Sequence, residues 1–189
     1  WPGSAMDATS SSTPLEMLHA ADATSTATAE ASATLAAVDL PSYLDLFSGN
    51  VAGVIGETSA LALLIGFAYL LYRGVISWRI PVIYIGTVGA ITFLFGAEGL
   101  FTGDGIYHIL SGGLMLGAIF MATDYSSSPI TPRGQIIFAL GCGIITSVIR
   151  LWGGYPEGVT YAILLMNVAA PLIDKYTIPK IYGEVKVNA

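Results

Sequence analysis

The chain has 189 residues, of which 54% are hydrophobic and only 11% are charged, and its net charge is −6. Soluble domains usually carry about 25% charged residues, so this composition argues against a water-facing globule and indicates a membrane protein. The absence of a basic stripe argues against a nucleic-acid partner. One cysteine and two histidines cannot by themselves hold an iron–sulfur cluster or a bis-histidine haem.

Residues 1–50 form an acidic head without lysine or arginine. Residues 4–38 are mostly Ala, Ser and Thr, which predicts a flexible or loosely docked segment in water. The head contains a near-duplication, DATSSST at 7–13 and DATSTAT at 22–28. Because the chain begins at Trp1 and shows no signal-peptide pattern, we expect it to be a piece of a longer protein. The whole net charge resides on six carboxylates of the head: Asp7, Glu16, Asp22, Glu30, Asp39 and Asp45.

Five apolar segments follow the head, and each is about as long as a membrane span. The pieces between them carry the charges and turn-forming residues expected of short loops. Five buried helices of a soluble protein are the alternative to a membrane domain. The segments cover residues 54–72, 79–98, 105–122, 134–151 and 158–174.

The basic residues predict how these segments are oriented, because short cytoplasmic loops are enriched in lysine and arginine. If the five segments alternate across the membrane, only Arg150 falls on one side. The C-terminus is therefore predicted to be cytoplasmic and the acidic head external. The basic residues on the cytoplasmic side are Arg73, Arg79, Arg133, Lys175, Lys180 and Lys186.

Polar groups near the apolar segments are costly in a membrane and are functional candidates. Glu57 opens the first segment, where a carboxylate either caps the helix or serves a site. Asp104 and His108 are one helical turn apart and form either a structural or a functional pair. Asp124 follows the third segment and either caps a turn or belongs to a site. Asn167 needs a hydrogen-bond partner on another helix.

Small residues predict close approach between helices. Gly113 and Gly117 are four positions apart, a spacing that admits a second backbone or a flat ring system. Cys142 lies between two glycines and is predicted to be a small packing residue.

Three stretches together resemble one known family: DATSSSTPL at 7–15, GETSALALLIG at 56–66 and HILSGGLMLGAIFMATD at 108–124. The chain resembles the C-terminal half of the RnfD family, the D subunits of the Rnf complex, which is an ion-translocating ferredoxin:NAD oxidoreductase. It is more distantly similar to the B subunit of the sodium-translocating NADH:quinone oxidoreductase. The resemblance implies an all-α membrane protein, in which five transmembrane helices form one half of a ten-helix inverted-repeat fold similar to that of urea transporters.

The charge pattern and the resemblance divide the chain into three parts. Residues 1–50 are expected to form an extended external segment that bears a flavin, residues 51–176 the five-helix transmembrane domain, and residues 177–189 a cytoplasmic tail. The resemblance implies a multi-pass protein of the inner (cytoplasmic) membrane, surrounded by the lipid bilayer.

The resemblance also implies a flavin attachment site. In the family a flavin transferase esterifies a threonine hydroxyl with the phosphate of FMN, within the pattern D-x-x-[ST]-[GS]-A-T. Ser12 departs from this pattern, because the family usually has alanine there. The second copy of the motif keeps the alanine before Thr28 but lacks the following Pro-Leu, so Thr13 is the predicted site and Thr28 its competitor. The matching residues are Asp7, Ser10, Ser11 and Thr13.

The family function implied is that of a membrane subunit of a redox-driven ion pump. Covalent FMN relays electrons between ferredoxin and NAD while sodium ions or protons cross the membrane, and the chain is not catalytic alone. The other Rnf subunits, especially a second covalent-FMN subunit, are the implied partners, and a non-covalent riboflavin is a further implied cofactor. Glu57, Asp104 and Asp124 are the acidic candidates for an ion path.

Two alternatives to the electron relay remain open. One is a channel or facilitator, which predicts transport without flavin, and the other is a structural subunit without its own redox centre. Neither alternative explains why the D-x-x-S-x-x-T-P-L segment occurs beside these membrane motifs.

Overall fold

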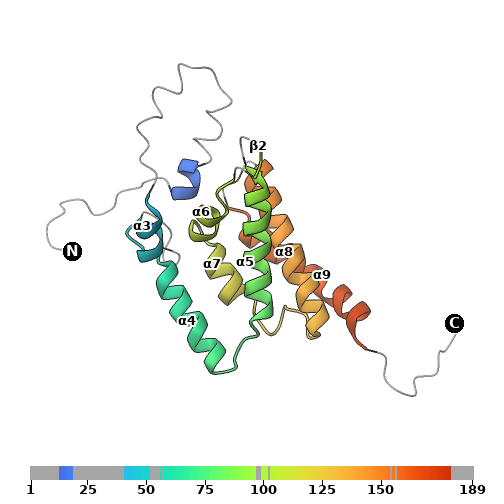
Figure 1. Ribbon diagram of the computed structural model, residues 1–189. Helices are drawn as coiled ribbons and strands as arrows, with labels where there is room; N and C mark the ends of the chain where they lie inside the picture. Colours follow the sequence, from blue (N-terminus) through green and yellow to red (C-terminus); the bar gives the residue numbers. More distant parts are fainter. Residues whose placement is uncertain are drawn as a thin grey trace, which may run out of the picture.

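The computed structural model describes residues 13–18, 41–51, 56, 58–96, 99–101, 103–153, 155 and 157–179. These residues are mostly helical, as predicted, and each of the five apolar segments contains helix (Figure 1). After a helical turn at residues 14–18, the elements are α3 (Tyr43–Ser48), α4 (Ala60–Tyr72), α5 (Arg79–Leu94), β1 (Phe95–Gly96), β2 (Gly99–Leu100), α6 (Gly105–Leu110), α7 (Leu114–Leu116), the π-helix η1 (Gly117–Met121), α8 (Pro132–Trp152) and α9 (Val159–Thr177).

Side-chain caps fix where two of the long helices begin. Ser59 accepts a hydrogen bond from the amide of Ala62 at 3.4 Å, at the start of α4. Thr131 accepts one from the amide of Gly134 at 3.0 Å, and Pro132 occupies the first helical position of α8. The caps satisfy amide donors that lack a partner within the helix.

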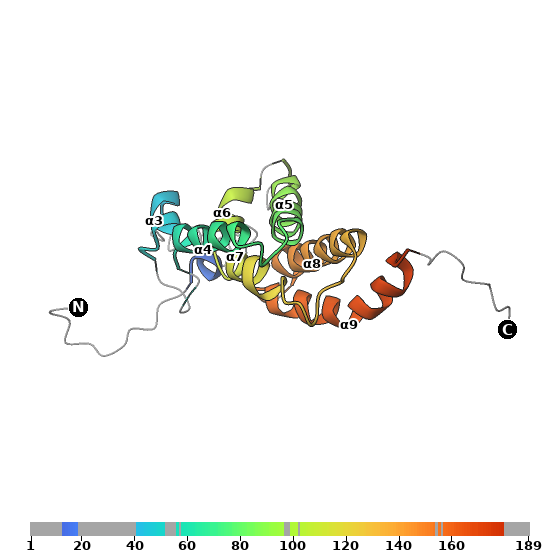
Figure 2. The ribbon, with the colours of Figure 1, turned by 90° about the horizontal axis from the view of Figure 1, so that it is seen from below.

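The helices run back and forth between two ends of the molecule. α4 and the third segment run in one direction, α5 and α8 run in the other, and α9 returns (Figure 1). α5 packs against α8 and α6, and α8 packs against α9. Figures 1 and 2 both place α3 and α4 at one side of the molecule and α9 at the opposite side, with α5 and α8 between them.

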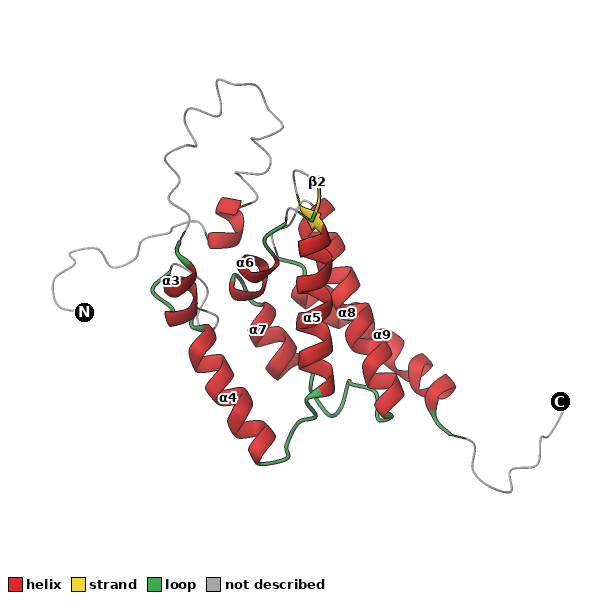
Figure 3. Cartoon of the chain, viewed as in Figure 1, coloured by secondary structure: helices red, strands yellow, loops and turns green. Residues whose placement is uncertain are grey.

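The second apolar segment ends earlier than predicted. α5 stops at Leu94, and β1 pairs with β2 in a short antiparallel hairpin (Figure 3). The expectation of helix through residue 98 is therefore wrong, and these two strands of two residues each are a short exception to the expected all-α fold. Gly96 and Gly99 face each other in the hairpin, and glycine weakens a helix interior.

The core lies between α5, α8 and α9 and is closed by the third segment. Tyr84 and Thr146 are fully buried and share a hydrogen bond of 2.6 Å between α5 and α8. Cys142 is fully buried and forms no disulfide, in agreement with its predicted packing role. The buried cluster comprises Ile80, Tyr84, Val88, Leu114, Ala118, Ala122, Phe138, Ala139, Cys142, Val159, Ile163 and Ala170.

The outer faces of the long helices are apolar and exposed. Ile65 of α4, Ile144 of α8 and Val168 of α9 are 63%, 49% and 82% exposed. A soluble helical bundle turns such side chains inward, whereas helices that face lipid leave them outside. Among the described residues, only α8 is both long and apolar enough to cross a membrane, and α4 and α5 are shorter apolar helices.

Exposed tyrosine and tryptophan side chains gather near the ends of the helices. Such amphipathic rings are enriched where a membrane meets water. Their placement and the apolar helix faces both favour a membrane protein over a soluble bundle. At one end of the molecule these residues are Tyr43, Trp152, Tyr155 and Tyr161, and at the other end they are Tyr69, Tyr72, Trp78, Tyr125 and Tyr176.

Candidate functional site

The third apolar segment is a broken helix, whereas the sequence predicts one continuous span. It consists of α6, α7 and η1, and residues 111–113 between α6 and α7 leave the helical conformation. Gly112 has a φ of +70°, a conformation that glycine adopts without a steric penalty. Broken helices occur within membrane proteins where the protein itself surrounds the break, and they often mark transport sites.

Two charged side chains from neighbouring elements satisfy the backbone of this break. Arg150, in the last turn of α8, is 1% exposed and donates through Nη1 to the carbonyl of His108 at 2.5 Å and through Nη2 to that of Ser111 at 3.5 Å. Glu157 accepts a hydrogen bond from the amide of Gly113 at 2.7 Å. Arg150 is thus a buried group bonded to the end of α6, which accounts for the one basic residue on its side of the predicted topology.

Thr13 begins the helical turn at residues 14–18. Its Oγ1 accepts a hydrogen bond from the amide of Glu16 at 3.3 Å, and Oε2 of Glu16 accepts one from the amide of Thr13 at 2.9 Å. This reciprocal pair is a capping box, with Pro14 in the first helical position. Because Oγ1 acts as an acceptor in the box, its proton stays available to another group.

This turn packs onto the broken helix. Leu15 is fully buried, and the hydroxyl of Tyr107 in α6 donates to the carbonyl of Pro14 at 3.4 Å. A Cβ added to Gly112 would lie 3.3 Å from Cδ2 of Leu15 and 3.3 Å from Nη2 of Arg150. Residues 13–18 are therefore packed, which differs from the loose docking predicted from the composition of the head.

Asp104 caps α6 at the same end of the molecule. Its Oδ1 accepts a hydrogen bond from the amide of Tyr107 at 3.0 Å, and its Oδ2 accepts one from the hydroxyl of Tyr43 in α3. The hydrogen bond to the carboxylate raises the pKa of Tyr43 above its ordinary value. The rings of Tyr43 and Tyr107 meet edge to face, with centroids 6.4 Å apart. Asp104 thus joins α3 to α6.

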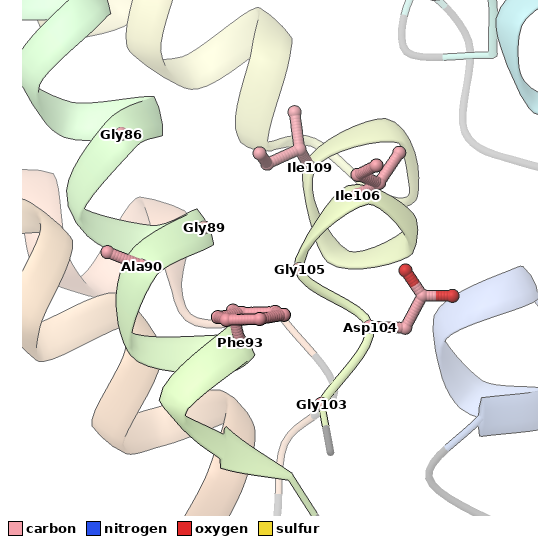
Figure 4. A pocket seen from close by; sticks show the side chains of 9 residues that line it. All are labelled: Gly86, Gly89, Ala90, Phe93, Gly103, Asp104, Gly105, Ile106 and Ile109. Atoms are coloured by element: carbon pink, nitrogen blue, oxygen red, sulfur yellow. The ribbon is translucent and has the colours of Figure 1, made fainter. Parts of the chain in front are cut away.

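A cavity of about 630 Å³ lies between α5 and α6. A Cβ added to Gly86 would meet no atom within 4 Å, so this glycine leaves open space in the wall. The carboxylate of Asp104 points away from α5 (Figure 4). The small, apolar walls suit a flat or apolar group. Gly86, Gly89, Ala90 and Phe93 line the cavity from α5, and Gly103, Asp104, Gly105, Ile106 and Ile109 line it from the other side (Figure 4).

The structure does not bring together the two described ion-path candidates, Asp104 and Asp124. Asp124 lies after η1, far along the chain from Asp104, and its exposed carboxylate accepts hydrogen bonds from the hydroxyls of Ser126 and Ser127. These hydrogen bonds lower the pKa of Asp124, and they correspond to the turn-capping role left open by the sequence. Glu57 lies outside the described residues.

Parts of the flavin motif also lie outside the described residues. These parts are residues 7–12 and the competing Thr28. The described portion of the predicted motif begins at Thr13.

The remaining polar candidates lie within the helical body. His108 is buried in α6, where its carbonyl binds Arg150 as described above. Oγ of Ser111 and Oδ1 of Asn167 are buried without a hydrogen-bond partner among the described residues. Gly117 serves helix packing, because a Cβ at this position would collide with Cγ1 of Val159 on α9.

Sequence reasoning missed three residues that shape this region. Leu15 was missed because residues 4–38 are mostly small and polar. The stretch T-P-L-E does carry a signal for a helical turn, because it combines a capping box with a proline at the first helical position. Arg150 carries a signal too, as the one basic residue on its side of the predicted topology. Glu157 carries none, since an acid in a Gly-rich loop resembles any solvated turn residue.

Comparison with known proteins identifies relatives over most of the chain. The profile of the "NQR2, RnfD, RnfE family" matches residues 1–183. The D subunit of a Na(+)-translocating ferredoxin:NAD(+) oxidoreductase complex of Acetobacterium woodii is 53% identical over 184 residues, which are 96% of this chain and 52% of that protein.

Two further relatives cover a smaller part of the chain. The D subunit of a proton-translocating ferredoxin:NAD(+) oxidoreductase complex of Clostridium ljungdahlii is 56% identical over 142 residues, or 75% of this chain and 43% of that protein. The D subunit of an ion-translocating oxidoreductase complex of Stutzerimonas stutzeri is 47% identical over 141 residues, or 74% of this chain and 40% of that protein. The chain spans about half the length or less of these relatives.

Proposed function

The chain belongs to the NQR2, RnfD, RnfE family, and from this membership we propose that it is a membrane subunit of a redox-driven ion pump. Its relatives are named as subunits of ion-translocating oxidoreductase complexes. In this role the chain works within an Rnf complex that transfers electrons between ferredoxin and NAD while sodium ions or protons cross the membrane. It has no catalytic activity alone.

Thr13 carries FMN through a phosphoester in this proposal. The observation that supports it most is the position of Thr13, which is half-buried and begins a turn that is packed on the protein. Its Oγ1 keeps a proton that esterification removes. α6 binds this turn through Tyr107 and also lines the cavity beside α5. A partly accessible hydroxyl on a segment that is held against α6 fits an attached flavin.

FMN supplies the redox chemistry when it is attached, by accepting and releasing electrons. The chain has three tasks around it. Thr13 holds the phosphate, and Leu15 and Tyr107 hold the turn that contains Thr13. The glycines and Phe93 of the cavity offer a low-polarity wall to a flat ring system. A non-covalent riboflavin belongs to the proposal as well, without an assigned site.

Ion coupling sets an energetic requirement for this pump. Moving one charge against 100 mV takes about 2.3 kcal/mol. For each cation moved, one electron must therefore pass through a difference in redox potential of at least about 100 mV. We assign Glu57, Asp104 and Asp124 as candidates for the path, of which Asp104 adjoins the cavity. Neutralising each in turn and measuring ion transport against electron flow tests the assignment, which fails if the ratio stays unchanged in all three variants.

The proposed arrangement places five spans of this chain in the inner membrane as one half of a ten-helix inverted repeat. The head at residues 1–50 is external and the tail at residues 177–189 is cytoplasmic. Apolar helix faces and the two groups of exposed tyrosine and tryptophan side chains support a membrane location. The partners are the other Rnf subunits, above all a second one with covalent FMN, and a flavin transferase is needed for maturation.

In-gel flavin fluorescence of the denatured chain tests this function. The chain is produced with its flavin transferase as wild type, Thr13→Ala, Thr28→Ala and the double variant. We expect a fluorescent band in the wild type and in Thr28→Ala, and no fluorescence in Thr13→Ala. If fluorescence is lost only in Thr28→Ala, the flavin is attached to the second copy of the motif. If the wild-type chain shows no flavin fluorescence, a channel or a structural subunit becomes the better explanation.

A further inference from the structure

The helical turn at residues 14–18 is too short to be stable by itself. Isolated helices shorter than about 12 residues are marginal in water, and the capping box of Thr13 and Glu16 is exposed. The turn must therefore gain its stability from contacts with the rest of the protein. The described contacts of this kind come from Leu15 and from the carbonyl of Pro14.

Those contacts lie at the break in the third segment and in the turn of α6 just before it. Leu15 approaches Gly112, the residue with a positive φ, and Tyr107 binds Pro14 from the last full turn before the break. Gly112 is also the point that Arg150 and Glu157 approach. A side chain at position 112 would enter the space that Leu15 and these two charged groups now occupy.

We propose that the break at residues 111–113 is a docking site for the turn that carries Thr13, with Leu15 as the side chain that is bound. Tyr107, Arg150 and Glu157 are its positioning residues, because they hold the carbonyl of Pro14 and the backbone of the break. The assignment of a flavin to Thr13 rests on the proposed function, whereas the docking itself does not. The break therefore has an internal occupant.

Docking at the break links two parts of the mechanism. A group attached to Thr13 is held at a fixed place beside α6 instead of moving with a free tether. A shift of α6 relative to α8 changes the contacts of Arg150 with the carbonyls of His108 and Ser111, and so changes the surface on which Leu15 rests. The flavin position and the shape of the broken helix are coupled through these contacts.

Limited proteolysis of the full complex tests docking without any need for flavin. Glutamyl endopeptidase cleaves after Glu16 only when this turn unfolds into the extended form that a protease binds. We expect Leu15→Ser to speed cleavage after Glu16 by at least tenfold, and Leu15→Met to restore most of the protection. The matched control is Leu44→Ser on α3, whose side chain is 77% exposed, and it should leave the rate unchanged.

Tyr107→Phe gives a second test that leaves the helical body intact. It removes one hydroxyl, so a rise in cleavage of two- to threefold is expected. Rates are normalised to those of the denatured chains, which removes any direct effect of the substitution on the protease. Equal cleavage after Glu16 in the wild type, Leu15→Ser and Tyr107→Phe would overturn the docking site.

Fluorescence anisotropy of the attached flavin separates this inference from the proposed function. With FMN on the wild-type head, we expect high anisotropy in the native complex and a fall towards the value of a free tether in Leu15→Ser. A flavin whose anisotropy is the same in both proteins contradicts the docking site while leaving the attachment intact. An unmodified head that still protects Glu16 contradicts the flavin assignment while supporting the docking site.

Discussion

α8 and the third segment are neighbours in the fold, yet one is a continuous helix and the other is broken. α8 runs for 21 residues from Pro132 to Trp152 without interruption. The third segment needs two short α-helices and a π-helix to cover a similar stretch. Glycine occurs in both, so glycine content alone does not decide which segment breaks.

The difference lies in the partners available to the freed backbone. The break leaves carbonyls and an amide inside the protein, where groups without hydrogen bonds are costly. α8 provides Arg150 for the carbonyls, and the loop before α9 provides Glu157 for the amide of Gly113. The broken segment is thus stable because Arg150, in the last turn of the continuous helix α8, binds its free carbonyls.

Removing Arg150 should have the largest effect on this pairing. Arg150→Leu leaves the carbonyls of His108 and Ser111 without their charged donor, and we expect a loss of about 3 kcal/mol. For a chain of this size that loss corresponds to a fall in Tm of roughly 6–12 °C. Thermal unfolding of the full chain in detergent measures it.

The control for this variant is Arg73→Leu at the exposed end of α4. Substitution of an exposed arginine at a helix end should change stability by less than about 0.5 kcal/mol. A similar Tm for both variants would show that the break does not depend on Arg150.

Two glycines, one on η1 and one on α5, should respond in opposite ways to substitution by alanine. In Gly117→Ala the added Cβ collides with Val159, so overpacking should cost about 1–3 kcal/mol. In Gly86→Ala the Cβ enters open space, and the better helix former should stabilise α5 by up to about 1 kcal/mol. Tm shifts of opposite sign are therefore expected, and a fall of equal size in both contradicts the packing described for η1.

Tyr84→Phe tests the contact that joins α5 to the continuous helix. It removes the hydroxyl that bonds Thr146 at 2.6 Å in the core and should cost about 1 kcal/mol. The Tm of Tyr84→Phe, read beside that of Thr146→Val, measures the contact. If the bond matters, the double variant loses less than the sum of the two single losses, whereas additive losses contradict it.

The smallest effect expected is at Asp124, at the other end of the third segment. Hydrogen bonds from Ser126 and Ser127 lower its pKa below the ordinary 3.8, so their stabilising effect is present above pH 3.8 and is lost as the pH falls through the lowered value. Ser126→Ala should move the pKa of Asp124 upward. Carboxyl infrared titration, with Asp124→Asn as the reference that lacks this group, measures the shift, and an unchanged pKa rules out the capping role.

Hydropathy and turn residues were enough to predict the order and approximate bounds of the helical segments. They could not predict the break, because S-G-G within an apolar run is compatible with a packed helix as well as with an interruption. What decides the outcome is Arg150, about 40 residues further along the chain, and sequence spacing does not reveal that pairing.

The candidate site was predictable in part. The resemblance selects Thr13, and the T-P-L-E stretch that begins with it encodes a capped helical turn. Burial of Leu15 was not predictable, since it depends on the space above Gly112. Only charge and expected depth in the membrane point to the ion-path acids in the sequence, and the described ones, Asp104 and Asp124, both serve as caps.

Mass spectrometry of peptides released by glutamyl endopeptidase shows whether Thr13 carries FMN. Cleavage after Glu16 and Glu30 places Thr13 and Thr28 in different peptides, so each threonine is read separately. We predict that the peptide ending at Glu16 carries the mass of one FMN less one water, and that the peptide of residues 17–30 is unmodified. An unmodified peptide ending at Glu16, from protein made together with its flavin transferase, would show that Thr13 does not carry FMN.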